Sequence, residues 1–88
     1  MNFKPNEMKT NIMQFLQNNG FTENLESDSD YVSYNKEGCY GVDVGNDEVV
    51  LIDDSGDFAH IPMNHCTLYA LFGMLFHYHQ LDVNYKWI

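Results

Sequence analysis

The stretch YVSYNKEGCYGVDVGNDEVVLIDDSGDFAHI, residues 31–61, decides the fold. Short apolar runs alternate in it with clusters of Asn, Gly, Asp and Ser, which are the residues that favour tight turns. Because short loops join successive runs, the stretch predicts a four-stranded antiparallel meander. The predicted strands are Tyr31–Tyr34, Cys39–Val44, Glu48–Ile52 and Phe58–Ile61.

A helix is predicted on each side of the meander. Pro5 suits the first turn of a helix and Gly20 suits a left-handed C-cap, so the first helix is expected over residues 5–19. Asn64 is a suitable N-cap for a second helix over residues 64–80. This second helix is uncharged on most of its circumference. It is therefore expected either to lie sandwiched inside the domain or to meet another chain with its second face.

The remaining segments complete the predicted architecture. Residues 22–30 are acidic and polar, and indicate a loop or an irregular edge. From Leu81 onward apolar and polar residues alternate, which predicts a short C-terminal strand or arm. The fold class is thus α+β in a single domain over residues 1–88, with both helices packed on one face of the sheet. The other face is expected to be solvated and acidic.

Charge is the most distinctive property of the chain. Thirteen acidic residues face four lysines and no arginine, for a formal charge of −9. Between Glu23 and Asp57 there are eleven acids and only Lys36, so this segment carries −10 and the rest of the chain +1. Coulomb repulsion argues against direct binding to nucleic acid or to an anionic membrane. We therefore expect a basic protein surface as the partner.

The acidic residues of the predicted meander and its approach loop are the candidate partner-binding residues. Electrostatic steering would give them fast and salt-sensitive association with a basic surface. The alternative is a solvated acidic face that only keeps a small protein soluble. The candidates are Glu26, Asp28, Asp30, Glu37, Asp43, Asp47, Glu48, Asp53, Asp54 and Asp57.

Catalytic and metal-binding patterns are weak in this sequence. His60, His65 and Cys66 are candidates for a minor zinc or thiol site, but the further ligands that a tetrahedral site needs do not follow at suitable spacing. The segment 53–57 resembles a calcium loop, but the glycine and the glutamate of that motif are not in place, so a hairpin turn is predicted. We expect no enzyme activity and no cofactor, and we expect free thiols at Cys39 and Cys66.

Apolar surface offers a second hypothesis of function. The chain would be a homodimeric or hetero-complex assembly protein that uses the helix at 64–80 and the C-terminal tail. The candidate interface residues are Ala70, Gly73, Met74, His77, Tyr85 and Trp87.

In size, acidity and lack of catalytic groups, the chain resembles the small inhibitors that phages and mobile elements encode against host or CRISPR-type nucleases, the anti-CRISPR proteins. This resemblance implies an inhibitor that mimics nucleic acid and occupies the nucleic-acid groove of a nuclease or another nucleic-acid-binding protein. Because Met1–Pro5 is polar and no apolar leader follows it, a cytoplasmic location is expected.

Overall fold

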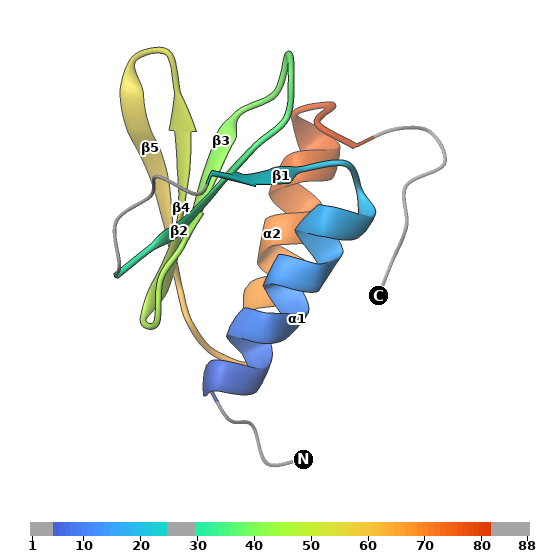
Figure 1. The fold of residues 1–88 in the computed structure, drawn as a ribbon. Coiled ribbons are helices and arrows are strands. Elements are labelled where there is room, and N and C mark those ends of the chain that lie inside the picture. Colours follow the sequence, from blue (N-terminus) through green and yellow to red (C-terminus); the bar gives the residue numbers. More distant parts are fainter. Residues whose placement is uncertain (1–4, 25–29, 82–88) are drawn as a thin grey trace.

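Consecutive hairpins build the sheet in a computed structural model that describes residues 5–24 and 30–81. Every strand pairs antiparallel with its neighbour in the chain, in the order β1-β2-β3-β4-β5 (Figure 1). The predicted turns at Asn46-Asp47 and Asp54-Ser55 lie between paired strands, as expected for a meander. The strands are β1 (Thr22–Asn24), β2 (Val32–Asn35), β3 (Gly41–Val44), β4 (Glu48–Asp53) and β5 (Gly56–Pro62).

The prediction of four strands in the meander was wrong by one. β1 lies in the segment that was expected to be a loop or an irregular edge, and it is an edge strand in which Thr22 pairs with Asn35 and Asn24 with Ser33. All three residues of β1 are exposed, so backbone pairing rather than an apolar pattern makes this strand. Among the residues that the structure describes, no strand follows the second helix. The predicted C-terminal strand or arm falls on residues 82–88, outside the described part of the chain.

Helix α1 (Pro5–Asn18) confirms the first predicted helix to within one residue. Gly20 has a φ of +89°, and the backbone N–H of Phe21 donates to the Leu16 carbonyl oxygen at 3.0 Å. This is the glycine-dependent helix ending that the sequence predicts. The Lys36 ammonium adds a further cap, because it donates to the Asn19 carbonyl oxygen at 3.0 Å.

Helix α2 (Thr67–His77) is shorter than the predicted helix 64–80. Asn64 is not its N-cap: the side-chain oxygen of Asn64 accepts the Cys66 N–H at 2.7 Å, in the turn that precedes the helix. The helix ends before His79, which takes a left-handed φ of 58°. The backbone N–H of Gln80 then returns to the Leu75 carbonyl oxygen at 2.8 Å.

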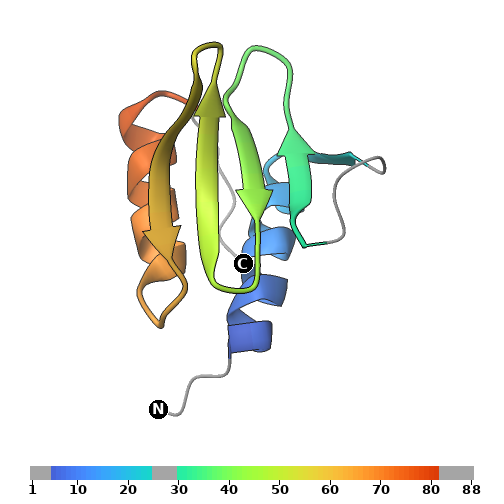
Figure 2. The ribbon, with the colours of Figure 1, turned by 90° about the vertical axis from the view of Figure 1, so that its left-hand side faces the viewer.

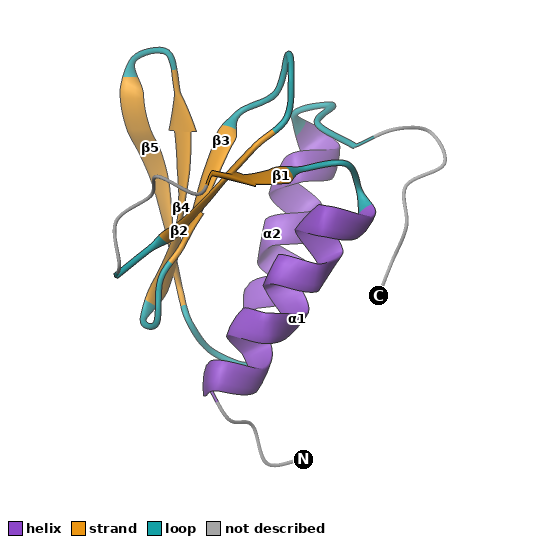
Figure 3. Cartoon of the chain, in the orientation of Figure 1, coloured by secondary structure: helices purple, strands orange, loops and turns teal. Residues whose placement is uncertain are grey.

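Both helices cover the same face of the sheet (Figure 3). Inward-facing strand residues and one face of each helix form the core, which makes most of the hydrophobic stabilisation. Its fully buried side chains are Ile12, Phe15, Leu16, Tyr34, Val42, Val44, Val49, Leu51, Leu71 and Leu75.

The second face of α2 carries exposed aromatic side chains, so this helix is not sandwiched between described elements. Tyr69 is 66% exposed and Phe76 is 57% exposed. Of the predicted interface residues, Ala70, Gly73 and His77 are exposed, whereas Met74 is partly buried against the core. Neither described helix is long and apolar enough to cross a membrane.

Candidate functional site

The face of the sheet turned away from the helices, here called the outer face, is uncovered by any described helix or strand (Figure 2). Strand alternation assigns its residues. In β3, Val42 and Val44 are buried on the helix side, so Asp43 between them points outward. Cross-strand pairing then places Ser33 beside Asp43 on one side and Val50 on the other.

A solvent-open groove of about 660 Å³ lies on the outer face. Polar side chains from β1, β2 and β3 line one part of it, and the end of β4 with the β4–β5 turn lines another. The loop between β2 and β3 also contributes lining residues. The lining residues are Asn24, Ser33, Asn35, Gly38, Cys39, Tyr40, Gly41, Asp43, Ile52, Asp53 and Asp54.

The groove brings together three of the predicted partner-binding acids, Asp43, Asp53 and Asp54. Asp43 and Asp53 are partly buried and Asp54 is exposed. Asp53 also shapes the turn, since its carboxylate accepts the Ser55 N–H at 2.8 Å. The carboxylate of Asp43 has no hydrogen bond or ion pair to any residue in the described ranges.

The other predicted acids are distributed differently. Glu48 and Asp57 lie on the strands β4 and β5, outside the groove. Three further acids are exposed in the turns and loops next to the strands, namely Asp30, Glu37 and Asp47. Glu26 and Asp28 lie outside the described residues.

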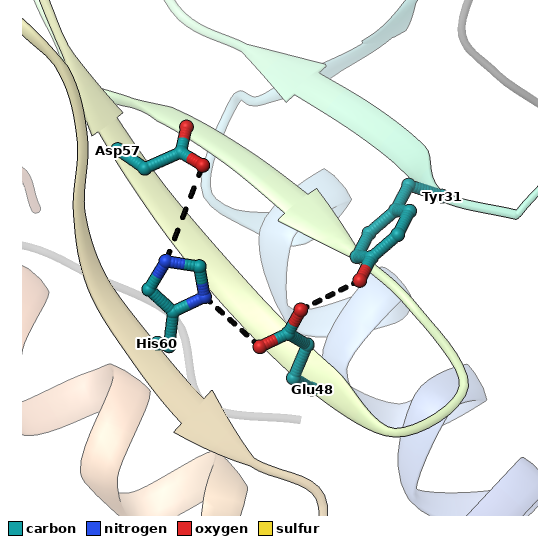
Figure 4. Close-up of polar contacts among 4 residues, drawn as sticks. All are labelled: Tyr31, Glu48, Asp57 and His60. Carbon is teal, nitrogen blue, oxygen red and sulfur yellow. Dashed lines mark hydrogen bonds and ion pairs between the residues drawn. The ribbon is translucent and has the colours of Figure 1, made fainter.

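Glu48 is the centre of a small polar cluster, which Figure 4 shows. Its carboxylate accepts the Tyr31 hydroxyl at 2.6 Å and contacts His60 Nδ1 at 2.9 Å. The other ring nitrogen of His60 lies 4.0 Å from Asp57. A protonated His60 would therefore bridge the carboxylates of Glu48 and Asp57.

The hydroxyl of Tyr31 lowers the pKa of Glu48, and the hydrogen bond from His60 lowers it further. The same contact with Glu48 raises the pKa of the Tyr31 hydroxyl. The hydrogen bond from Tyr31 favours the ionised carboxylate and the neutral phenol, and the contact with His60 also favours the ionised carboxylate. Glu48 is thus held as an anion, but its oxygens are already occupied by neighbours within the domain.

An aromatic cluster adjoins one end of the groove. The ring of Tyr40 packs edge-on against Phe58 at 4.9 Å and against Tyr78 at 5.6 Å between centroids. Gln80 holds this loop to the end of α2, because its side-chain oxygen accepts the Tyr40 N–H at 2.6 Å. Sequence reasoning missed the cluster, since its members come from a loop, a strand and the residue after a helix.

No protein-family model, curated protein or solved structure matches this chain. The chemistry of the outer face is therefore the basis for assigning a function.

The described lysines do not neutralise the negative charge of the groove, because both are bound elsewhere. The Lys9 ammonium donates to Asn46 Oδ1 at 2.9 Å, at the β3–β4 turn. Lys36 caps α1 and lies 5.7 Å from the centre of the Phe21 ring. Neither described lysine therefore contacts Asp43, whose side chain lies on the outer face.

The predicted zinc residues His60, His65 and Cys66 are not brought together as metal ligands in the described part of the chain. His60 is engaged with Glu48 on β5, whereas His65 and Cys66 are exposed in the segment before α2. Within residues 5–24 and 30–81, no three His, Cys, Asp or Glu side chains are placed to hold a metal ion. Cys39 and Cys66 are free thiols, as predicted. Tyr85 and Trp87 of the predicted interface lie outside the described residues.

Proposed function

We propose that this chain is a non-enzymatic binding module whose outer sheet face docks on a basic protein surface. The observation that carries the proposal is the open groove lined by Asp43, Asp53 and Asp54, with the described lysines bound elsewhere. Carboxylates on a rigid sheet present negative charge at fixed spacing, as a nucleic-acid backbone does. The basic surface of a nucleic-acid-binding protein is thus the favoured target, and occupying it would inhibit that protein.

Capture of partners from a host lysate at two salt concentrations tests this proposal. The Debye length falls from roughly 14 Å at about 50 mM salt to roughly 4 Å at about 500 mM. A basic nucleic-acid-binding protein should be captured at the low salt concentration and released at the high one. Release should also follow when its own nucleic acid is added as a competitor.

A pair of charge-matched variants separates the groove from net charge. Asp43→Asn/Asp53→Asn removes two charges from the groove, and the amide introduced at position 53 keeps an oxygen that can accept the Ser55 N–H. Glu7→Gln/Glu23→Gln removes two charges at exposed positions that do not line the groove and are not candidate partner-binding residues. We expect the first pair to reduce the association rate about tenfold or more and the second to change it about twofold or less. Equal effects of the two pairs, or capture that ignores salt, would count against the proposal.

The exposed face of α2 supports a second candidate function, self-assembly. Tyr69 and Phe76 together present aromatic surface on this helix, beside the small residues Ala70 and Gly73. Large exposed aromatic side chains are typical of interface centres. If this face forms a homodimer, sedimentation at about 50 μM should show a dimer, because dimers of μM affinity are populated at that concentration. The variant Phe76→Ser should then be a monomer. A monomeric parent protein would remove this candidate.

A further inference from the structure

We propose that the groove on the outer face binds an arginine side chain carried on an extended segment of the partner, with Gly41 leaving the space and Asp43 and Asp53 supplying the counter-charge. This inference rests on the proposed function and deepens it. It replaces a general attraction between an acidic and a basic surface by one defined contact.

The space in the groove depends on glycine at position 41. A Cβ atom placed on Gly41 would lie 3.6 Å from Asn35 Oδ1 and 3.7 Å from the Cβ atom of Ile52. These are ordinary van der Waals contacts, and the backbone there does not need a left-handed φ. A Cβ atom at position 41 could therefore be accommodated at ordinary contact distances, and it would take up part of the hollow that is now open.

No described lysine pairs with the Asp43 carboxylate. Asp43 is partly buried between neighbouring strands, and its carboxylate has no polar partner within the described residues. A partly buried carboxylate without a partner favours the approach of a cation, because the cation replaces lost hydration. Glu48 differs in this respect, since Tyr31 and His60 already occupy its oxygens.

The mixture of lining groups favours arginine over lysine. A guanidinium is planar and carries five N–H donors, so it can meet several oxygens at once. The groove offers carboxylates at Asp43 and Asp53 and hydroxyl or amide oxygens at Ser33 and Asn35.

The shape of the site favours an extended segment. Its volume of about 660 Å³ exceeds that of one guanidinium group, and the groove is open to solvent on the uncovered face of the sheet. Backbone on either side of the arginine can thus lie across the outer face. A metal ion suits this groove less well than an arginine side chain does, because the described residues contain no group of three metal ligands.

The probe for this inference is a twelve-residue peptide of alternating arginine and glycine, compared with the same peptide containing lysine. Each is titrated into isotope-labelled protein at low salt, and backbone amide shifts are recorded. We expect the largest shifts at Ser33, Gly41 and Asp43. We also expect the arginine peptide to bind about fivefold or more tightly than the lysine peptide, because only the guanidinium can make paired hydrogen bonds.

Filling the groove without changing its charge is the decisive variant. Gly41→Val should weaken binding of the arginine peptide about tenfold or more, and Gly41→Ala should have a smaller effect in the same direction. Dispersed amide spectra establish that each variant is folded, and Gly41→Ala is the fallback if the valine variant is not. Glu7→Gln, outside the groove, should bind as the parent does.

The outcomes distinguish this inference from the function on which it rests. If Gly41→Val binds the peptide as tightly as the parent, or if lysine equals arginine, the arginine contact is wrong even where salt-dependent capture from the lysate succeeds. If capture of a basic protein fails as well, the proposed function fails with it. Shifts spread evenly over the acidic residues, Asp30 and Asp47 included, would also overturn the inference.

Discussion

Leu71→Ala is expected to lower the free energy of unfolding by about 2–5 kcal/mol. Leu71 is fully buried, and it lies between Leu68 and Leu75 on the face of α2 that contacts the core. The helix has only 11 residues, so few other contacts hold it on the sheet. Truncation removes apolar contacts and leaves a cavity beneath the helix, and partial collapse recovers only part of this loss.

Gly73→Ala is the matched control in the same helix. An added Cβ at this position meets no atom within 4 Å, and the position is exposed. Alanine should therefore raise the free energy of unfolding by up to about 1 kcal/mol through helix propensity alone. Urea unfolding followed by circular dichroism measures both changes. A loss below about 1 kcal/mol for Leu71→Ala would show that α2 is not anchored through this face.

Gly45→Ala is expected to cost about 1–3 kcal/mol, although it adds a single methyl group. Gly45 is buried, and a Cβ atom there would lie 2.7 Å from Cε2 of the Tyr31 ring. The ring must move, and the hydrogen bond from its hydroxyl to Glu48 at 2.6 Å would be lost with it. Tyr31→Phe is the matched variant, since it removes the hydroxyl and keeps the ring over the glycine.

The pKa of Glu48 provides a separate readout of both variants. In the parent the folded-state pKa of Glu48 lies below its ordinary value of 4.5, first because Tyr31 donates to it and then because of His60. This contribution to stability is present above the unfolded-state pKa and is lost as the pH falls through the folded-state value. Tyr31 is shifted upward by the same contact, so its contribution is lost as the pH rises through its folded-state pKa, above 10.0.

Both variants should therefore raise the pKa of Glu48 and flatten the acid side of the stability profile. Carboxyl NMR titration reports the pKa, and urea midpoints between about pH 3 and 7 report the profile. An unchanged Glu48 pKa in Tyr31→Phe would show that the phenol does not hold this carboxylate. An unchanged pKa in Gly45→Ala alone would show that the ring escapes the methyl group without losing its hydrogen bond.

Local signals in the sequence were sufficient for most of the fold. Pro5 and Gly20 bound α1 because each acts within one helical turn, and the turn residues between strands act over two or three positions. β1 was missed because all its side chains are exposed, so no apolar pattern marks it. It is a strand because its backbone pairs with that of β2. The start of α2 was misplaced because Asn64 caps a preceding turn instead of the helix.

The site was predictable in charge but not in arrangement. Counting acids identified the acidic half of the chain, yet it could not separate Asp43, which faces the groove, from Glu48, which is paired with Tyr31 and His60. That distinction depends on the register of three strands, and a shift of one residue would reverse the face of every side chain. Alternation of Glu48 and His60 within their strands, and of Tyr31 just before β2, was the available signal for the polar cluster.

The chain-ordered meander also has a kinetic consequence. Each strand finds its partner across the next loop, so every step of sheet assembly closes only a short segment of chain and costs little entropy. Domains dominated by such local pairings fold faster than those whose sheets join distant segments. The contact between α1 and α2, which lie at opposite ends of the described chain, is the one that must wait for the sheet. We expect substitutions at that contact to change the rate of unfolding more than the rate of folding.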